Sequence, residues 1–591
     1  MPPLPTPAQN GVRTRSPALT LRLFIAVNNT CRIAAGHLGT RLAAKRPIWN
    51  FSGEASQLSA VGLSALWLIC EKNVTLRSLD ISSNSVGATA EDAIGISRML
   101  LTSTALETLR LGNNQLGDLK SQLRPIGRGL SANRTLTLLD LSSNRLYPEG
   151  TKVVCNALRA CLSLKVIDLS YNSPGREPAL PGMIMSHPML QSIGIIEKEP
   201  QTRSEKTWWL DPRAKEAVGR ALLASPGTVM YCQCDTFSLT ESTQVLEWGS
   251  RSSCDAVILA GVLRSNTVLR TLDVDTAGEL DDYSREEIGC AILANRKGQL
   301  GYSNMFGLKD GGSPQHTVDL KDKEHIRSRR SFTLFCGLIR SNTTLTSLTL
   351  ISIAAEHIEV LASGLSTNIT LRDLRLEAPS KGGAAMSVVT LPVQALNGLN
   401  GVKDIDLSHA GGPDQDGSQP IHRYGNAVIG ELLNFNTSVQ RLKLNPGSLV
   451  DGGAILNHLN RARKSSLQTL DLAGIGLGDR GGVMFFEALL DGKCKFLSAL
   501  NLCDNRLTDI AIGQLMVECM RDPTCNISTL NLASNQLGPL VVAQTVKHNK
   551  TLTALDICNN PIDGEPTHAH AALACGRLAL GAKTRRPSTR N

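Results

Sequence analysis

Aromatic side chains make up only 4% of the 591 residues, although 42% of the residues are hydrophobic. The core must therefore be built from Leu, Ile, Val and Ala rather than around large rings. A chain of this length also exceeds the size at which one hydrophobic core stops growing. An array of thin, repeated layers meets both conditions, because each layer needs only small aliphatic side chains.

Acidic residues are missing from the first 53 positions, which hold seven cations, and four more cations stand near the C-terminus. The net charge of +9 therefore resides at the two ends, and the body is close to neutral. A neutral body disfavours nucleic-acid binding, which depends on Lys and Arg contacts with phosphates. The cations are Arg13, Arg15, Arg22, Arg32, Arg41, Lys45 and Arg46, then Lys583, Arg585, Arg586 and Arg590.

The chain has no run of 18 or more apolar residues, which predicts the absence of a membrane span. Its fifteen cysteines lack paired spacing, which favours reduced thiols and a cytoplasmic location, with the nucleus as an alternative. The basic N-terminus leaves organelle import as a less favoured alternative to a Pro-rich start followed by a helical cap.

Motifs for chemistry are also missing. No GxxxxGK[ST] or GxSxG stretch is present, and Cys232 and Cys234 are too close in sequence for a usual zinc knuckle. We therefore expect no cofactor, no metal site and no enzymatic activity.

A repeated frame is what the chain has in abundance. LRSLDISSNSV at Leu76 returns at Leu106, Leu136 and Leu164, in steps of 30, 30 and 28 residues. The other clear registers begin at Leu345, Leu371, Val402, Val439, Leu467, Leu497, Ile527 and Leu552, and weaker ones at Leu190, Val229 and Leu269.

Each repeat predicts a short strand followed by a helix. The alternating pair Leu139 and Leu141 places two side chains on one face of a strand. The apolar spacing in 151–161 is helical. Helices are wider than strands, so we expect an α/β solenoid bent into a horseshoe, with parallel strands on its concave face and helices on its convex face.

Asparagine recurs at two phases of the frame. The first follows the strand, where its amide can satisfy buried backbone groups, so that a ladder is expected. It occurs at Asn84, Asn114, Asn144, Asn172, Asn505, Asn535 and Asn560, and is lost from 229 to 475. The second belongs to Asn-x-Ser/Thr triplets that precede the strand, which we interpret as helix-ending structure rather than glycosylation sites. Examples are Asn73, Asn133, Asn342 and Asn368.

The frame LxxLxLxxNxL, followed by Gly and an amphipathic helix, resembles the ribonuclease-inhibitor class of leucine-rich repeats. That class includes the recognition arms of NLR immune receptors and Ran GTPase-activating protein. The resemblance spans about residues 48 to 575 and implies the solenoid fold. It implies little about function, because one fold serves many functions.

The domains expected are a Pro-rich basic segment and cap (1–47), regular repeats (48–200), degenerate repeats with insertions (201–340), further repeats (341–575) and a basic tail (576–591). In the long interval 280–331 we expect one degenerate repeat plus a loop.

The leading functional prediction is a non-catalytic scaffold that binds a protein partner of unknown identity on the concave face. Residues between the two apolar strand positions project from that face, and they lean acidic, which would steer a basic partner. The same aspartates also suit strand-end hydrogen bonding, and this alternative stays open. The predicted partner-binding residues are Asp80, Arg110, Asp140, Asp168, Asp273, Arg375, Asp406 and Asp471.

Two alternatives belong to other classes. Residues 141–144, followed by Pro148-Glu149-Gly150, look like the loop after an early repeat of Ran GTPase-activating protein. That resemblance implies a small GTPase as partner, with Asn144 and Arg145 near its nucleotide. The other alternative is a cytoskeletal or axonemal structural subunit, which nothing in the sequence distinguishes from a free scaffold.

Overall fold

The protein is described here by a computed structural model, which divides into two compact units, Met1–Gln299 and Leu300–Asn591. The predicted N-terminal segment and basic tail lie outside the described residues, apart from Pro47 and the strand at 579–580. The structure describes residues 47–52, 60–71, 73–84, 86–87, 89–118, 123–197, 210–226, 228–249, 252–274, 280–321, 324–377, 388–399, 401–406, 420–444, 466–491, 496–561 and 579–580.

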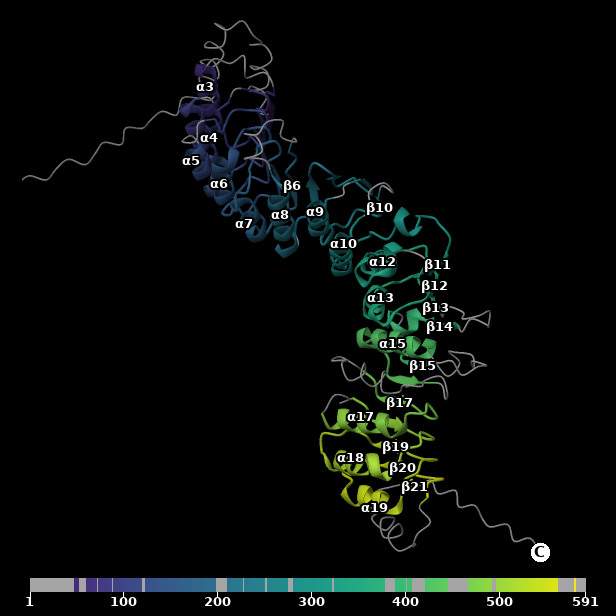
Figure 1. Cartoon of the computed structure of the whole chain (residues 1–591). Coiled ribbons are helices and arrows are strands. Elements are labelled where there is room, and N and C mark those ends of the chain that lie inside the picture. Colours follow the sequence, from purple (N-terminus) through teal and green to yellow (C-terminus); the bar gives the residue numbers. More distant parts are fainter. Residues whose placement is uncertain are drawn as a thin grey trace, which may run out of the picture. The chain divides into compact units, whose positions relative to one another are not determined.

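The N-terminal unit alternates strands and helices (Figure 1). Strands β1 to β8 form one sheet in chain order, and β9 and β10 form a second. The strands are β1 (Ile48–Asn50), β2 (Ser78–Asp80), β3 (Thr108–Arg110), β4 (Leu138–Asp140), β5 (Val166–Asp168), β6 (Ser192–Gly194), β7 (Tyr231–Gln233), β8 (Ser238–Leu239), β9 (Val245–Trp248) and β10 (Thr271–Val274). The helices are α3 (Ala60–Glu71), α4 (Ala90–Thr102), α5 (Leu123–Ala132), α6 (Tyr147–Leu158), α7 (Ala179–Ser186), α8 (Pro212–Ala224), α9 (Ser253–Leu263) and α10 (Asp282–Ala294).

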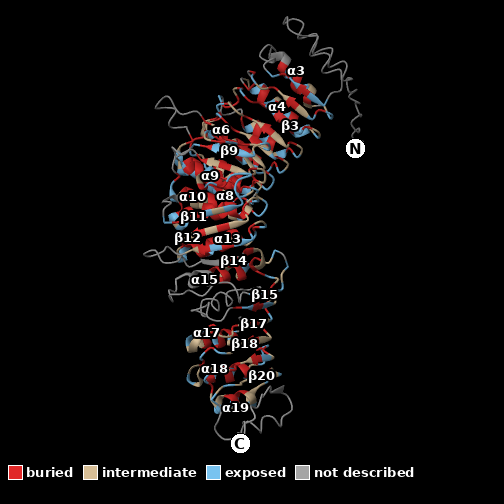
Figure 2. Cartoon of the chain, turned by 90° about the vertical axis from the view of Figure 1, so that its right-hand side faces the viewer, coloured by how far each residue is buried: buried red, intermediate tan, exposed pale blue. Residues whose placement is uncertain are grey.

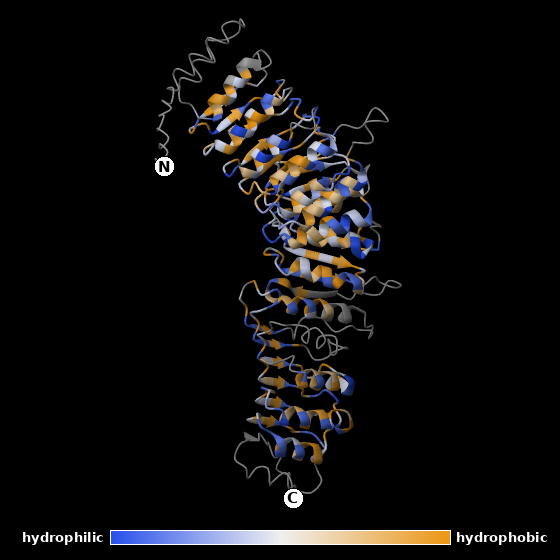
Figure 3. Ribbon diagram, turned by 90° about the vertical axis from the view of Figure 1, so that its left-hand side faces the viewer, coloured by the Kyte–Doolittle hydropathy of each residue, from blue (hydrophilic) through white to orange (hydrophobic). Residues whose placement is uncertain are grey.

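The C-terminal unit contains a four-stranded sheet, β11 to β14, and a seven-stranded sheet, β15 to β21. In its last repeats both the strands and the helices combine hydrophobic and hydrophilic residues (Figure 3). The strands are β11 (Gln315–Asp319), β12 (Ser347–Ile351), β13 (Asp373–Glu377), β14 (Val388–Pro392), β15 (Asp404–Asp406), β16 (Arg441–Lys443), β17 (Thr469–Asp471), β18 (Ala499–Asn501), β19 (Thr529–Asn531), β20 (Ala554–Asp556) and β21 (Ala579–Leu580). The helices are η3 (Asn304–Phe306), α11 (Glu324–Arg327), α12 (Arg329–Ser341), η4 (Ala355–His357), α13 (Ile358–Leu365), α14 (Val393–Leu396), α15 (Pro420–Phe435), α17 (Gly478–Leu490), α18 (Asp509–Arg521) and α19 (Pro539–His548).

All fifteen predicted registers coincide with strands, which confirms the α/β solenoid. The sequence frame did not predict β9, because Thr243 occupies a position where the frame expects a large apolar residue. The degenerate repeat expected within 280–331 corresponds to β11. Two strands depart from the parallel arrangement, since β8 and β14 are antiparallel to their neighbours. Only four residues join β7 to β8, which is too short for a crossover helix.

The core lies between each sheet and its helices, as the buried residues in Figure 2 show. Most helices bury one side, but every residue of α9 from Cys254 to Leu263 is buried. Several of the scarce aromatic residues form a cluster around α12 in the C-terminal unit. Phe335 packs 5.5 Å from Phe306 and 5.7 Å from Phe332, whose ring lies 4.9 Å from that of His357, measured between ring centroids.

The first asparagine ladder is confirmed. Asn144 donates from Nδ2 to the carbonyls of Leu111, Leu141 and Ser142, at 2.8 to 3.0 Å. Its own backbone N–H donates to Oδ1 of Asn172 in the next repeat, at 2.9 Å. Each asparagine thus joins two repeats and satisfies carbonyls that would otherwise be buried without partners.

A second ladder follows the helices and spans the region where the first is lost. Asn368 donates from Nδ2 to the carbonyl of Ile339 at 2.6 Å, and its Oδ1 accepts from the backbone N–H of Leu371 at 2.6 Å. Asn295 and Asn342 cap the C-termini of α10 and α12. The helix-ending interpretation of the Asn-x-Ser/Thr triplets is confirmed at Asn342, which belongs to such a triplet and caps α12. Other members are Asn133, Asn266, Asn397 and Asn436.

Candidate functional site

The predicted partner-binding residues of the N-terminal unit lie in one row across the sheet. The strand register places Asp80, Arg110, Asp140 and Asp168 opposite one another on β2 to β5. The three aspartates are half-buried, whereas Arg110 is exposed. We call these four residues the strand-face row.

Each aspartate of the strand-face row also has a structural bond. Oδ1 of Asp140 accepts from the backbone N–H of Ser142 at 2.9 Å, and Asp80 and Asp168 do the same two residues on. The adjacent glycines leave room for these carboxylates, because a Cβ added at Gly112 would lie 3.0 Å from both carboxylate oxygens of Asp140. Strand-end hydrogen bonding, the alternative use of these aspartates, is therefore present. Among the described residues, the second oxygen of each carboxylate accepts no hydrogen bond.

The other predicted residues lie on three further sheets, so the structure does not bring all eight together. Asp273 is half-buried on β10, and Arg375 forms an ion pair with Glu377 at 3.8 Å. Asp406 pairs with Lys443 at 3.4 Å across β15 and β16, beside a pair between Asp404 and Arg441. Asp471 accepts from the backbone N–H of Ala473, as the aspartates of the strand-face row do from theirs.

The two residues suggested for GTPase contact differ in position. Asn144 is 0% exposed, and its side chain is held in the first ladder. Arg145 is exposed, has a positive φ of 53° and forms an ion pair with Asp118 at 3.3 Å. The structure therefore gives Asn144 no surface to present to a nucleotide, and the GTPase alternative stays an untested prediction.

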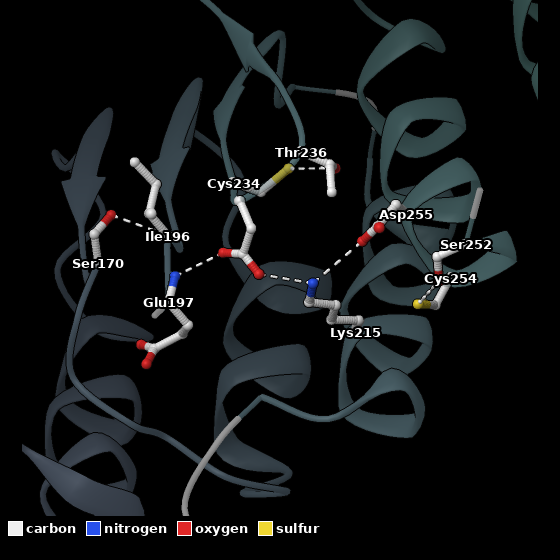
Figure 4. Close-up of polar contacts among 10 residues, drawn as sticks. Ser170, Ile196, Glu197, Lys215, Cys234, Thr236, Ser252, Cys254 and Asp255 are labelled. Atoms are coloured by element: carbon white, nitrogen blue, oxygen red, sulfur yellow. Dashed lines mark hydrogen bonds and ion pairs between the residues drawn. The ribbon is translucent and has the colours of Figure 1, made fainter. Parts of the chain in front are cut away.

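A largely buried ionic network lies where the first ladder ends (Figure 4), in which Glu197, Lys215 and Asp255 are buried and Asp235 is partly exposed. Nζ of Lys215, on α8, lies 2.7 Å from Oδ2 of Asp235 and 3.4 Å from Oδ1 of Asp255. Oδ1 of Asp235 accepts from the backbone N–H of Glu197 at 2.6 Å. The Glu197 carboxylate accepts in turn from the backbone N–H of Asn172 at 2.9 Å. Glu197 thus replaces the next asparagine, and the network continues the ladder with charged groups.

The electrostatics of this network follow from burial. Desolvation raises the pKa of Glu197 to about 7, against the backbone hydrogen bonds from Asn172 and Ser173, and the charge of Asp235 adds to the rise. Burial lowers the pKa of Lys215, but its bonds and charge interactions with Asp235 and Asp255 outweigh that effect and leave the pKa above its ordinary value. Lys215 therefore stays charged, and Glu197 is the group that titrates near neutral pH.

We expect the N-terminal unit to lose stability as the pH rises from about 4.5 to 7. The folded pKa of Glu197 is raised, so its contribution is fully present below the unfolded value and is lost as the pH rises through the folded value. Glu197→Gln should remove this dependence and be more stable than the wild type at pH 8, by up to about 3 kcal/mol. Urea unfolding between pH 4.5 and 8 measures it, with exposed Glu216→Gln on α8 as the control. Identical pH profiles for wild type and Glu197→Gln would contradict the assignment.

The cysteine pair singled out in the sequence is part of the core. Cys232 and Cys234 are both buried, at the end of β7. Their thiols share a hydrogen bond, which raises the pKa of Cys232, where burial acts in the same direction, and lowers the pKa of Cys234 against the effect of burial. Because both cysteines are buried, they occupy the apolar positions of the repeat frame, as the sequence indicated.

Comparison with known proteins finds similarity to leucine-rich repeats. The sequence model described as Leucine Rich repeat matches residues 72–90 and 132–155. NACHT, LRR and PYD domains-containing protein 14 from Mus musculus is 31% identical over 138 residues, which are 23% of this chain and 14% of that protein. The chain therefore spans only a small part of this relative.

Similar solved structures include the leucine-rich-repeat-containing protein LegL7 from Legionella pneumophila, at 16% identity and a TM-score of 0.27, over 56% of this chain and 90% of that one. The mouse RP105/MD-1 complex is similar at 13% identity and a TM-score of 0.23, over 90% of this chain and 94% of that one. The helices within the described ranges are too short or too polar to cross a membrane. The chain therefore has the fold of a leucine-rich-repeat solenoid, and two of its segments match the repeat model.

Proposed function

We propose that the chain is a non-catalytic scaffold that binds a protein partner on the strand face of its N-terminal unit. The observation that supports this most is the strand-face row, four charged side chains in register on adjacent strands. The residue two positions after each member of the row, just beyond the strand, is small, so no large side chain stands there. These small residues are Ser82, Gly112, Ser142 and Ser170.

The partner should present basic groups to the aspartates and an acidic group to Arg110. Half-buried charges interact more strongly than fully exposed ones, because less solvent screens them. Among the described residues Arg110 has no ion pair of its own. The steps of 30, 30 and 28 residues favour the ribonuclease-inhibitor-like kind of repeat, whose surface of parallel strands suits such binding.

The test uses the triple variant Asp80→Asn, Asp140→Asn, Asp168→Asn. Asn keeps the oxygen that accepts from the backbone, so the variant removes charge without removing the strand-end bonds. Partners captured from the native cells by the tagged full chain are quantified by mass spectrometry. We expect a specific partner to fall by about tenfold or more.

The matched control removes the same charge from the helix side, with Glu91→Gln, Glu149→Gln and Glu216→Gln, all exposed. Capture should be unchanged in this control. A partner lost equally from both variants, or retained by both, would contradict binding at the strand face.

A further inference from the structure

We infer that helices α4, α5 and α6 present a second binding surface, for an acidic, amphipathic segment of a partner protein. This surface is on the helix side and does not depend on the strand-face proposal. Its five cations, which we call the basic helix patch, are Arg98, Arg124, Arg128, Lys152 and Arg159.

The repeat brings four of these cations together, and the fifth, Arg159, directly follows α6. Arg98 on α4 and Arg128 on α5 each stand eight residues before the first Leu of the following frame, so they occupy equivalent positions. Arg124 and Lys152 are likewise equivalent, on α5 and α6. Because α5 packs against both α4 and α6 (Figure 1), equivalent positions lie side by side. Arg124 and Arg128 are four residues apart and share one side of α5.

The patch is exposed and lacks compensating charge. All five side chains belong to exposed residues, and none forms an ion pair within the part of the chain that the structure describes. The exposed carboxylates on these helices are Glu91 and Glu149, both in first turns. Arg220 on the helix side of α8 differs, because it pairs with Glu287 at 2.9 Å and with Glu216 at 3.9 Å. Five neighbouring cations without such partners repel one another, and an acidic ligand would relieve that repulsion.

Apolar side chains border the patch. Leu68 on α3 is 51% exposed, and Ile94 and Leu101 on α4 are 43% and 54% exposed. Leu68 occupies the same repeat position as Arg98, and Ile94 occupies the same repeat position as Arg124. An exposed apolar residue on one helix is therefore followed by a basic residue at the equivalent position of the next helix. Cations beside aliphatic groups match a helix with glutamates on one side and leucines on the other. A nucleic-acid backbone would match the cations but leave the aliphatic groups without partners.

The test measures fluorescence anisotropy of a labelled 18-residue amphipathic peptide of Glu and Leu, titrated with the full chain. We expect saturable binding that weakens with salt, and no binding of the same peptide with Lys in place of Glu. Arg124→Glu with Arg128→Glu should weaken binding by about tenfold or more. Arg213→Glu with Arg480→Glu, two exposed arginines on α8 and α17, is the matched control and should bind as the wild type does.

Leu101→Ser separates the proposal from simple charge attraction. We expect it to weaken peptide binding by about threefold at unchanged net charge, because one apolar contact is lost. The proposal is overturned if both charge-reversal variants bind equally, if Leu101→Ser has no effect, or if the chain binds phosphatidylserine vesicles or a DNA duplex through the patch but not the peptide.

Discussion

Asn172→Ala should lower the free energy of unfolding of the N-terminal unit by about 3 to 5 kcal/mol, because several buried backbone groups lose their partners at once. Nδ2 of Asn172 donates to the carbonyls of Leu141, Leu169 and Ser170, at 2.8 to 3.3 Å. Its Oδ1 accepts from the backbone N–H of Asn144. The side chain is buried, so water cannot replace these bonds without opening the repeat.

Tryptophan fluorescence during urea unfolding measures this effect selectively. All five tryptophans precede residue 300, so their emission reports on the N-terminal unit alone. They are Trp49, Trp67, Trp208, Trp209 and Trp248. The control is Asn156→Ala, at an exposed position of α6, which should change stability by less than about 0.5 kcal/mol. Equal midpoints for the two variants would mean that the ladder is not a source of stability.

The first ladder could be predicted from sequence because its asparagines keep one phase of the frame. Its continuation could not, because Glu197 stands one residue short of that phase and belongs to a residue type that is rarely buried. The second ladder was predicted only as helix-ending structure. Its function of joining repeats appears once Nδ2 of Asn368 is seen to reach the carbonyl of Ile339, 29 residues earlier.

The candidate site illustrates the same limit. The alternation of apolar and polar residues places Asp140 on the solvent face of β4 and Asp168 on the same face of β5. The regular spacing of the repeats then brings the two residues side by side. The pair of Asp406 and Lys443 joins residues 37 apart in sequence, in a region where the repeat length varies. Only the register of β15 and β16 shows that these two charges neutralise each other. Irregular spacing, rather than weak side-chain signals, conceals such contacts.

Lys215→Met should destabilise the N-terminal unit by about 3 to 5 kcal/mol, because it leaves the buried carboxylate of Asp255 without a cation, beside the partly exposed Asp235. Methionine keeps most of the apolar length of lysine, so lost packing contributes little. The control is Arg213→Met, exposed on the same helix, which should have little effect. The same fluorescence-monitored unfolding, at pH 7.5, compares the two.

Adding Asp235→Asn and Asp255→Asn to Lys215→Met should recover much of the lost free energy of unfolding. The two negative charges that the lysine neutralised are then gone. Asn at position 235 keeps the oxygen that accepts from the Glu197 backbone N–H, so the connection to the ladder survives. Recovery would mean that Lys215 serves mainly to neutralise the two aspartates. If the triple variant is no more stable than Lys215→Met, the destabilisation must come from packing or from the hydrogen-bond geometry of the lysine, and the electrostatic account of the network fails.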